Sequence, residues 1–173
     1  MTSVAHTLEV DSCTLTVRPI ANDQEVRACA EIMSTSEPWI TLRRTTTQAQ
    51  RILRDRELQE VHVALHDGQV VGFVIVVLKG AFVGYLRTIA VRADWRSRGL
   101  GRQLIGFAEE RIFRESPNAF LCVSSFNPRA RALYERLGYE TVGELRDYIV
   151  RGHSEWLMRK TLGPHTEFRR ESE

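Results

Sequence analysis

The sequence predicts a single domain of mixed α/β (α+β) class, built on a mostly antiparallel sheet. Asp67-Gly68 separates two apolar runs, 61–65 and 70–78, which is a strong signal for a β-hairpin. Two amphipathic segments follow, 100–113 and 128–137, and each is typical of a helix that packs on a sheet. A run of strands followed by helices that alternate with strands predicts a mixed sheet in which antiparallel pairs dominate.

The predicted elements follow one another in order from residue 13. Segment 13–19 alternates with period two and stops at Pro19, as a half-buried strand does, and Asn22 or Asp23 can cap a helix that runs to about Met33. The remaining elements are a surface helix over 47–56, strands over 61–65, 70–78 and 81–91, a helix over 100–113, a strand over 119–123, a helix over 128–137 between Asn127 and Gly138, and strands over 139–142 and 154–160. They give about seven strands in one domain over 13–162, with flexible termini at 1–12 and 163–173.

Composition narrows the class of protein. With 43% hydrophobic and 27% charged residues among 173, the chain has the composition of an ordinary globular domain, and its net charge of +2 is too small to indicate a nucleic-acid partner. Three scattered cysteines support neither a disulfide framework nor a metal site. The sequence has neither a secretion signal nor an apolar run long enough to span a membrane, so we expect a cytoplasmic protein.

A glycine-rich turn is the most informative segment. It reads Arg96-Ser-Arg-Gly-Leu-Gly-Arg102 and joins the predicted strand 81–91 to the helix that begins near Leu100. A turn of this kind exposes unpaired backbone N–H groups at the positive end of a helix dipole, where phosphate binds. Arg92, Arg96, Arg98 and Arg102 concentrate positive charge there, although such a run can also be a solvated basic face. We therefore interpret the turn as a pyrophosphate site.

Three patterns in the right order resemble the GNAT superfamily of acyl-CoA-dependent N-acetyltransferases. They are Leu86-Arg-Thr-Ile-Ala-Val91, Arg96-x-x-Gly99-x-Gly101, and Asn127-x-x-Ala130-x-x-Leu133-Tyr134-x-x-x-Gly138-Tyr139. The resemblance covers most of the chain. It implies a sheet splayed between its fourth and fifth strands to admit acetyl-CoA, helices on both faces, and, as in many relatives, a homodimer.

The resemblance also implies roles for individual residues. The backbone of the fourth strand would pair with the pantetheine arm, the glycine turn would bind the pyrophosphate, and Arg129 or Arg131 could reach the outer phosphates. The implied cofactor-binding residues are Ile89, Ala90, Val91, Arg96, Arg98, Gly99, Leu100, Gly101, Arg102, Asn127 and Arg129. Tyr134 matches the tyrosine that protonates the leaving thiolate, although a tyrosine beside Leu133 can also be an ordinary core residue.

The acceptor side departs from familiar members of the superfamily. Relatives carry a carboxylate near Arg87 or in a Leu-Glu-Val-Arg stretch, which aligns here with Leu121-Cys-Val-Ser124, and both acids are absent. An alkylammonium must lose a proton before attack, so a base is still required. The candidates are Glu37, His62, Asp147 and His153. Arg87 could hold a substrate carboxylate, and Trp39 could line an acceptor pocket or simply pack between helices.

These observations predict transfer of an acetyl group from acetyl-CoA to a primary amine, by direct attack through a tetrahedral intermediate and without a metal. Arg87 favours a small or amino-acid-like acceptor. Two alternatives stay open: a protein N-terminal or lysine acetyltransferase, and a non-catalytic acyl-CoA-binding regulatory module. Cys122 lies in an apolar strand and is expected to be a packed residue and not a nucleophile.

Overall fold

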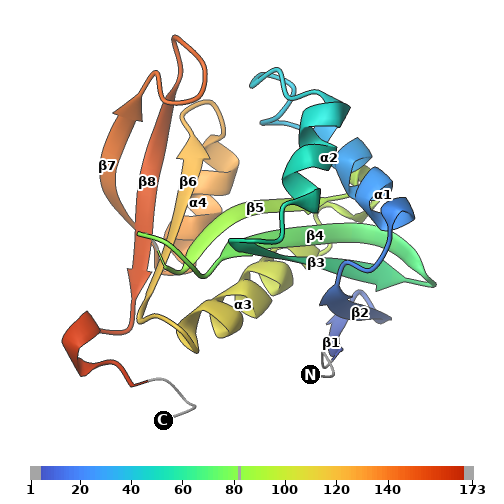
Figure 1. Ribbon diagram of the computed structural model, residues 1–173, viewed down its shortest axis with the longest axis horizontal. Helices are drawn as coiled ribbons and strands as arrows, with labels where there is room; N and C mark the ends of the chain where they lie inside the picture. Colours follow the sequence, from blue (N-terminus) through green and yellow to red (C-terminus); the bar gives the residue numbers. More distant parts are fainter. Residues whose placement is uncertain (1–4, 82, 170–173) are drawn as a thin grey trace.

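The computed structural model describes residues 5–81 and 83–169, and within them the chain forms one eight-stranded sheet and four α-helices (Figure 1). The strands are β1 (His6–Val10), β2 (Cys13–Pro19), β3 (Gln59–His66), β4 (Gln69–Val77), β5 (Tyr85–Val91), β6 (Asn118–Ser124), β7 (Glu140–Arg146) and β8 (Ser154–Thr161). The helices are α1 (Asp23–Ser34), α2 (Thr46–Arg54), α3 (Leu100–Phe113) and α4 (Pro128–Arg136), with 3-10 turns η1 (Ala93–Trp95) and η2 (His165–Glu167). The predicted α/β class is confirmed.

The sheet, of order β1-β2-β3-β4-β5-β6-β8-β7, consists of two antiparallel units that separate from each other. Strands β1 to β5 form one unit, and β6, β8 and β7 form the second. Where the units meet, β5 and β6 run parallel and share one pair of partner residues, Tyr85 and Phe120. The two strands then diverge (Figure 1). We call this boundary the seam, and it confirms the predicted opening between the fourth and fifth predicted strands.

Strand β1 corrects the prediction of about seven strands and of a loose segment over 1–12. It pairs with β2 over five positions, from His6 with Val17 to Val10 with Cys13. The hairpin turns at Asp11 and Ser12, whose φ angles are 47° and 62°. Hairpin turns with positive φ angles usually contain glycine or asparagine, so an Asp-Ser pair does not predict one. Residues 1–4 lie outside the described residues.

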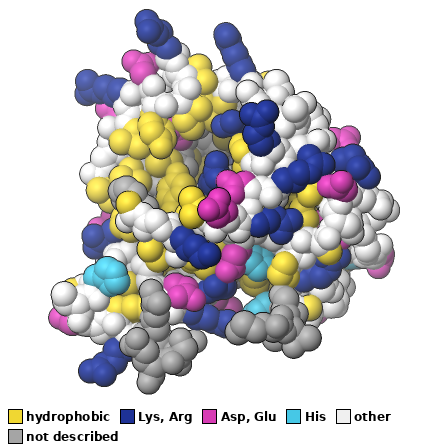
Figure 2. All heavy atoms as spheres, viewed as in Figure 1, with side chains coloured by type: hydrophobic (Ala, Val, Ile, Leu, Met, Phe, Trp, Pro, Cys, Tyr) yellow, Lys and Arg dark blue, Asp and Glu magenta, His cyan; other side chains and the backbone are white. Residues whose placement is uncertain are grey.

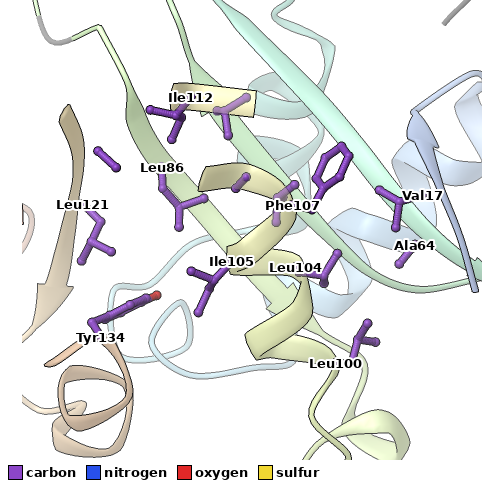
Figure 3. Packing of buried hydrophobic residues seen from close by; sticks show 14 of the residues in the cluster. Val17, Ala64, Leu86, Leu100, Leu104, Ile105, Phe107, Ile112, Leu121 and Tyr134 are labelled. Carbon is purple, nitrogen blue, oxygen red and sulfur yellow. The ribbon is translucent and has the colours of Figure 1, made fainter. Parts of the chain in front are cut away.

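Helices cover both faces of the sheet, as predicted. Alternate side chains of β4 point to opposite faces, where they belong to two different core clusters. Val74 belongs to the cluster that packs beneath α3 and α4, which Figure 3 shows with Ile105, Leu121 and Tyr134. Phe73 belongs to the second cluster, which lies under α1 and α2. The first cluster contains residues from both sides of the seam, so α3 and α4 join the two units of the sheet from one face.

The boundaries of the other elements differ from the predictions by a few residues. The strand predicted over 81–91 begins at Tyr85, and the helix predicted over 47–56 is Thr46–Arg54. The strand predicted over 139–142 is longer, Glu140–Arg146, and forms an edge of the sheet. Among the helices of the described residues, none is long and apolar enough to cross a membrane.

Candidate active site

The turn between β5 and α3 presents a row of free backbone donors. Ser97 and Gly99 both have positive φ, 63° and 89°, on either side of Arg98, and α3 begins at Leu100 without a side-chain cap. In the described part of the chain, the N–H groups of residues 97–102 donate to no backbone or side-chain acceptor. Backbone N–H groups that converge at a helix N-terminus form an anion site, as the sequence predicts for this turn.

The two glycines of the turn, Gly99 and Gly101, differ in their backbone conformation and in the space around them. Gly99 sits at a φ of 89°, which a residue with a side chain adopts only under strain. Gly101 has an ordinary conformation, and a Cβ built there meets only Val91 Cγ2, at 3.9 Å. The fold itself therefore tolerates a side chain at Gly101. The space above this residue fits a ligand that approaches the backbone closely.

The arginines around the turn do not all face it. Arg96 donates from Nε to the carbonyl of Val91 at 3.1 Å and also donates to the hydroxyl of Ser36, so it ties the turn to the loop after α1. Arg98 lies over the Trp95 ring, 5.2 Å from its centre. Arg102 is exposed, in the first turn of α3. A phosphate role for Arg96 stays a prediction.

Residues from α4 reach the turn across the seam. Arg129 donates from Nη2 to the Ser97 hydroxyl at 3.1 Å. Asn127 caps α4 by accepting from the N–H of Ala130 at 3.2 Å, which leaves its amide N–H groups free to donate. Arg131 is turned elsewhere, since it pairs with Glu135 and lies 4.5 Å from the centre of the Trp156 ring. Of the two predicted phosphate contacts, Arg129 is therefore the one near the turn.

The edge of β5 that faces the seam is open beyond its first residue. Ile89, Ala90 and Val91 pair with β4 on one side. On the other side β6 has already diverged, because the parallel contact is confined to Tyr85 and Phe120. An open strand edge can pair with an extended ligand.

Tyr134 lies on the opposite side of the seam from that edge. It is 7% exposed and points from α4 toward Ile105 of α3 (Figure 3). Its hydroxyl makes no hydrogen bond to any of the described residues, and burial raises the pKa of Tyr134 to about 12. The phenol therefore keeps its proton at neutral pH and is available as a hydrogen-bond donor.

A polar group of residues lies on the α2 side of the sheet, and of its members only Cys122 was considered in the sequence analysis, as a packed residue. Ser124 of β6 pairs with Glu155 of β8, and the Ser124 hydroxyl donates to the Glu155 carboxylate at 2.6 Å. Cys122 lies on the same face of β6 and beside the Tyr85 hydroxyl, and burial and Cys122 raise the pKa of Tyr85. We call Tyr85, Cys122, Ser124 and Glu155 the seam cluster. Only the pairing of β6 with β8 brings Glu155 there, so the sequence carries no local signal for it.

Arg87 and Trp39 lie on this same face. Leu86 pairs with Val76 and Thr88 with Ile75, so Arg87 is the extra residue of a bulge in β5. Its guanidinium donates to Gln59 Oε1 at 2.7 Å. Trp39, in the loop after α1, is half-buried at the edge of the second core cluster. Figure 2 shows hydrophobic side chains around a hollow in the upper part of this face, with Lys and Arg at its rim.

The four candidate bases predicted from the sequence are dispersed. His62 lies on the opposite face, 5.0 Å from the Phe107 ring of α3 in centroid distance. Glu37 accepts from the N–H and hydroxyl of Thr41, and Asp147 accepts from the N–H of Gly152. His153 lies near Glu155 and opposes the rise that burial causes in the pKa of that carboxyl. Of the four, His153 alone is placed beside the seam cluster.

No three His, Cys, Asp or Glu side chains of the described residues are arranged to hold a metal ion. The Cys122 pKa is raised, mainly by burial, so its thiol stays protonated.

Several known proteins are similar to this chain in sequence or in fold. An uncharacterized protein of Mycobacterium leprae is 40% identical over 76 residues, which cover 43% of this chain and only 21% of that protein. An N-alpha-acetyltransferase of Sulfurisphaera tokodaii is 32% identical over 114 residues, which cover 58% of this chain and 68% of that protein. The crystal structure of an aminoglycoside 6'-N-acetyltransferase complexed with coenzyme A has a TM-score of 0.70 at 16% identity, covering 86% of this chain and 97% of that chain.

The sequence pattern described as the Acetyltransferase (GNAT) family matches residues 24–139. That stretch extends from α1, through β5, the turn and α3, to the end of α4, and so contains the turn, the open edge of β5 and Tyr134, whereas Glu155 lies beyond it. The chain belongs to the GNAT family of acetyltransferases.

Proposed function

We propose that this protein is an N-acetyltransferase that moves an acetyl group from acetyl-CoA to a primary amine. One observation supports the proposal: free N–H groups at the start of α3 and the open edge of β5 lie on one side of the β5–β6 opening, and the buried Tyr134 of α4 lies on the other. An anion site, a strand edge and a proton donor are what a diphosphate, an extended arm and a thiol leaving group require.

The residues around the opening would hold acetyl-CoA as follows. The N–H groups from Arg98 to Arg102 would bind the diphosphate, with the glycines allowing its close approach. The Arg129 guanidinium, already at Ser97, would reach the outer phosphates, and the free amide N–H groups of Asn127 would contact the pantetheine. Ile89, Ala90 and Val91 would pair with the arm as a neighbouring strand does.

Acetyl-CoA supplies a thioester whose carbonyl carbon the amine attacks directly. N–H groups of β5 would stabilise the developing oxyanion. Tyr134 would give its proton to sulfur as the carbon–sulfur bond breaks. Its raised pKa of about 12 means that the phenol is protonated before that step.

The acceptor we propose is a small or amino-acid-like amine. Arg87 is held at the bulge of β5 by Gln59, on the face that carries the seam cluster, and a guanidinium in that position can bind a substrate carboxylate. A peptide N-terminal amine is the second candidate. It is favoured by the similarity to the N-alpha-acetyltransferase of Sulfurisphaera tokodaii.

Thiol release measured with a panel of amino acids, simple amines and peptides tests both the activity and the acceptor class. We expect acetyl-CoA-dependent turnover with at least one primary amine and an acetylated amine product. Saturable acetyl-CoA binding without turnover would instead identify a regulatory acyl-CoA-binding module. The cytoplasmic location and the homodimer expected from the sequence stay predictions.

A further inference from the structure

Two glutamates are buried among the described residues, and only one of them is paired with a cation. Glu25 accepts hydrogen bonds from Arg18, Asn22 and the N–H of Ala21. Glu155 is 4% exposed, and Ser124 donates to one of its oxygens at 2.6 Å. No arginine or lysine of the described residues forms an ion pair with it. A buried carboxylate without a cation is costly, and the cost is relieved either by a bound proton or by a cationic ligand.

The position of Glu155 indicates which ligand that is. It lies on β8, one strand away from the seam, and pairs with Ser124 at the end of β6 that has separated from β5. Its charge contributes to the raised pKa of Tyr85 on β5, so it acts across the seam. The titratable groups that influence it or its neighbour Tyr85 are Cys122 of β6 and Tyr148 and His153 of the loop after β7. None of these is a permanent cation. An alkylammonium entering the seam from the α2 side would meet this carboxylate.

We propose that Glu155 is the general base that removes the proton from the acceptor ammonium, with Ser124 positioning its carboxylate. This inference rests on the proposed function. The ammonium gives one proton to Glu155, which passes it to solvent, and the nitrogen lone pair then forms the bond to the thioester carbon. The nitrogen loses a second proton as the amide forms. That proton replaces the one that Tyr134 gives to the departing sulfur.

The neighbouring groups are less suited to this role. Burial raises the pKa of Tyr85, so its hydroxyl stays protonated and is not a resting base. Cys122 is protonated for the same reason. Burial also raises the pKa of Glu155, while Ser124 and His153 oppose that rise. The result is a carboxylate that is a stronger base than an exposed glutamate.

Glu155→Gln tests the proposal, with Glu144→Gln as the matched control. Glu144 is an exposed glutamate of the adjacent strand β7 that also accepts from a serine, Ser154, at 2.7 Å. With an amine whose ammonium pKa is about 10, we expect Glu155→Gln to lower kcat/KM about 100-fold at pH 7. The loss should shrink progressively as the pH rises from 7 toward 10, because free amine becomes more abundant. The acetyl-CoA dissociation constant should not change, and Glu144→Gln should behave as wild type.

A loss that is the same at every pH would overturn the role as base and leave a structural role. Glu155→Ala provides a second test, since added formate can occupy the vacated site and should restore turnover at pH 7. The inference is rejected if formate does not rescue a folded Glu155→Ala protein and the defect of Glu155→Gln is independent of pH. In that case the proposed function still stands, provided that the wild type acetylates an amine. If the wild type binds acetyl-CoA and acetylates no amine, the proposed function fails and this role fails with it.

Discussion

The two sides of the seam are built in different ways. On the side that we propose for acetyl-CoA, the turn presents backbone N–H groups of consecutive residues, 97–102, at the start of α3. On the side that we propose for the acceptor, the seam cluster consists of side chains from β5, β6 and β8, which the sheet brings together. An acyl donor that all members of a family share can be bound by main-chain groups, whereas an amine acceptor that differs between members requires side chains that differ between members. The following substitutions test that contrast.

The largest effect is expected at Tyr134 of α4. Tyr134→Phe removes a hydroxyl that has no partner among the described residues, so the fold should be nearly unaffected. Loss of a general acid should lower kcat by roughly 10²- to 10⁴-fold. Steady-state thiol release measures kcat, and calorimetric titration measures the affinity for acetyl-CoA. Equal losses in turnover and affinity would show that Tyr134 is a binding residue.

A side chain added to the turn should affect the acetyl-CoA side alone. Gly101→Ala places a methyl group where the protein offers only Val91 Cγ2 at 3.9 Å, so any loss of acetyl-CoA affinity reports the ligand. We expect a loss of about 10- to 100-fold, equivalent to about 1–3 kcal/mol of overpacking. Gly106→Ala in the middle of α3 is the control, because a Cβ there meets nothing within 4 Å.

Both alanine variants should be at least as stable as the wild type, since glycine costs up to ~1 kcal/mol in a helix. Unchanged acetyl-CoA affinity in Gly101→Ala would contradict the assignment of this turn to the diphosphate.

A smaller effect is expected from the arginine that crosses the seam. Arg129→Ala removes an exposed guanidinium next to Ser97, and we expect the acetyl-CoA dissociation constant to rise about fivefold, corresponding to about 1 kcal/mol. Because the contact is electrostatic, the difference from wild type should diminish at high salt. Arg131→Ala is the comparison, since that guanidinium lies over Trp156 and pairs with Glu135. Equal effects of the two variants would mean that only general positive charge is involved.

His62 should affect stability without affecting catalysis, because it lies on the α3 face. Burial lowers the pKa of His62 to about 4, whereas an unfolded histidine has a pKa of about 6.5. Above pH 6.5 both states are neutral. As the pH falls, the unfolded chain binds a proton that the folded chain does not, so stability decreases between pH 6.5 and 4.

Denaturant unfolding at pH 7 and pH 5 should show about 2 kcal/mol of loss from this group in the wild type. His62→Leu should show a correspondingly smaller loss and retain activity. A matching acid dependence in the variant would assign the effect to other groups.

The contrast also explains what the sequence could predict. Asp67-Gly68, the period of 13–19 and the amphipathic segments 100–113 and 128–137 are local patterns, and the structure has the corresponding hairpin, strand and helices. The glycine turn is local too. The β1 hairpin was not predicted because Asp11-Ser12 adopts positive φ without glycine. Glu155 was not identified because its neighbours Ser124 and Tyr85 are distant in sequence, and a glutamate in an alternating strand is normally a solvated residue.

The single partner pair between β5 and β6 has a consequence for how the molecule opens. The two units of the sheet are joined chiefly by side chains, with Leu86 on one unit and Leu121 on the other packed over Ile105 and its neighbours. A molecule bound along the seam would form hydrogen bonds to the strand edges that the protein alone does not make. Amide hydrogen exchange should therefore slow in β5 and β6 when such a molecule binds, and remain the same in the distant β1–β2 hairpin.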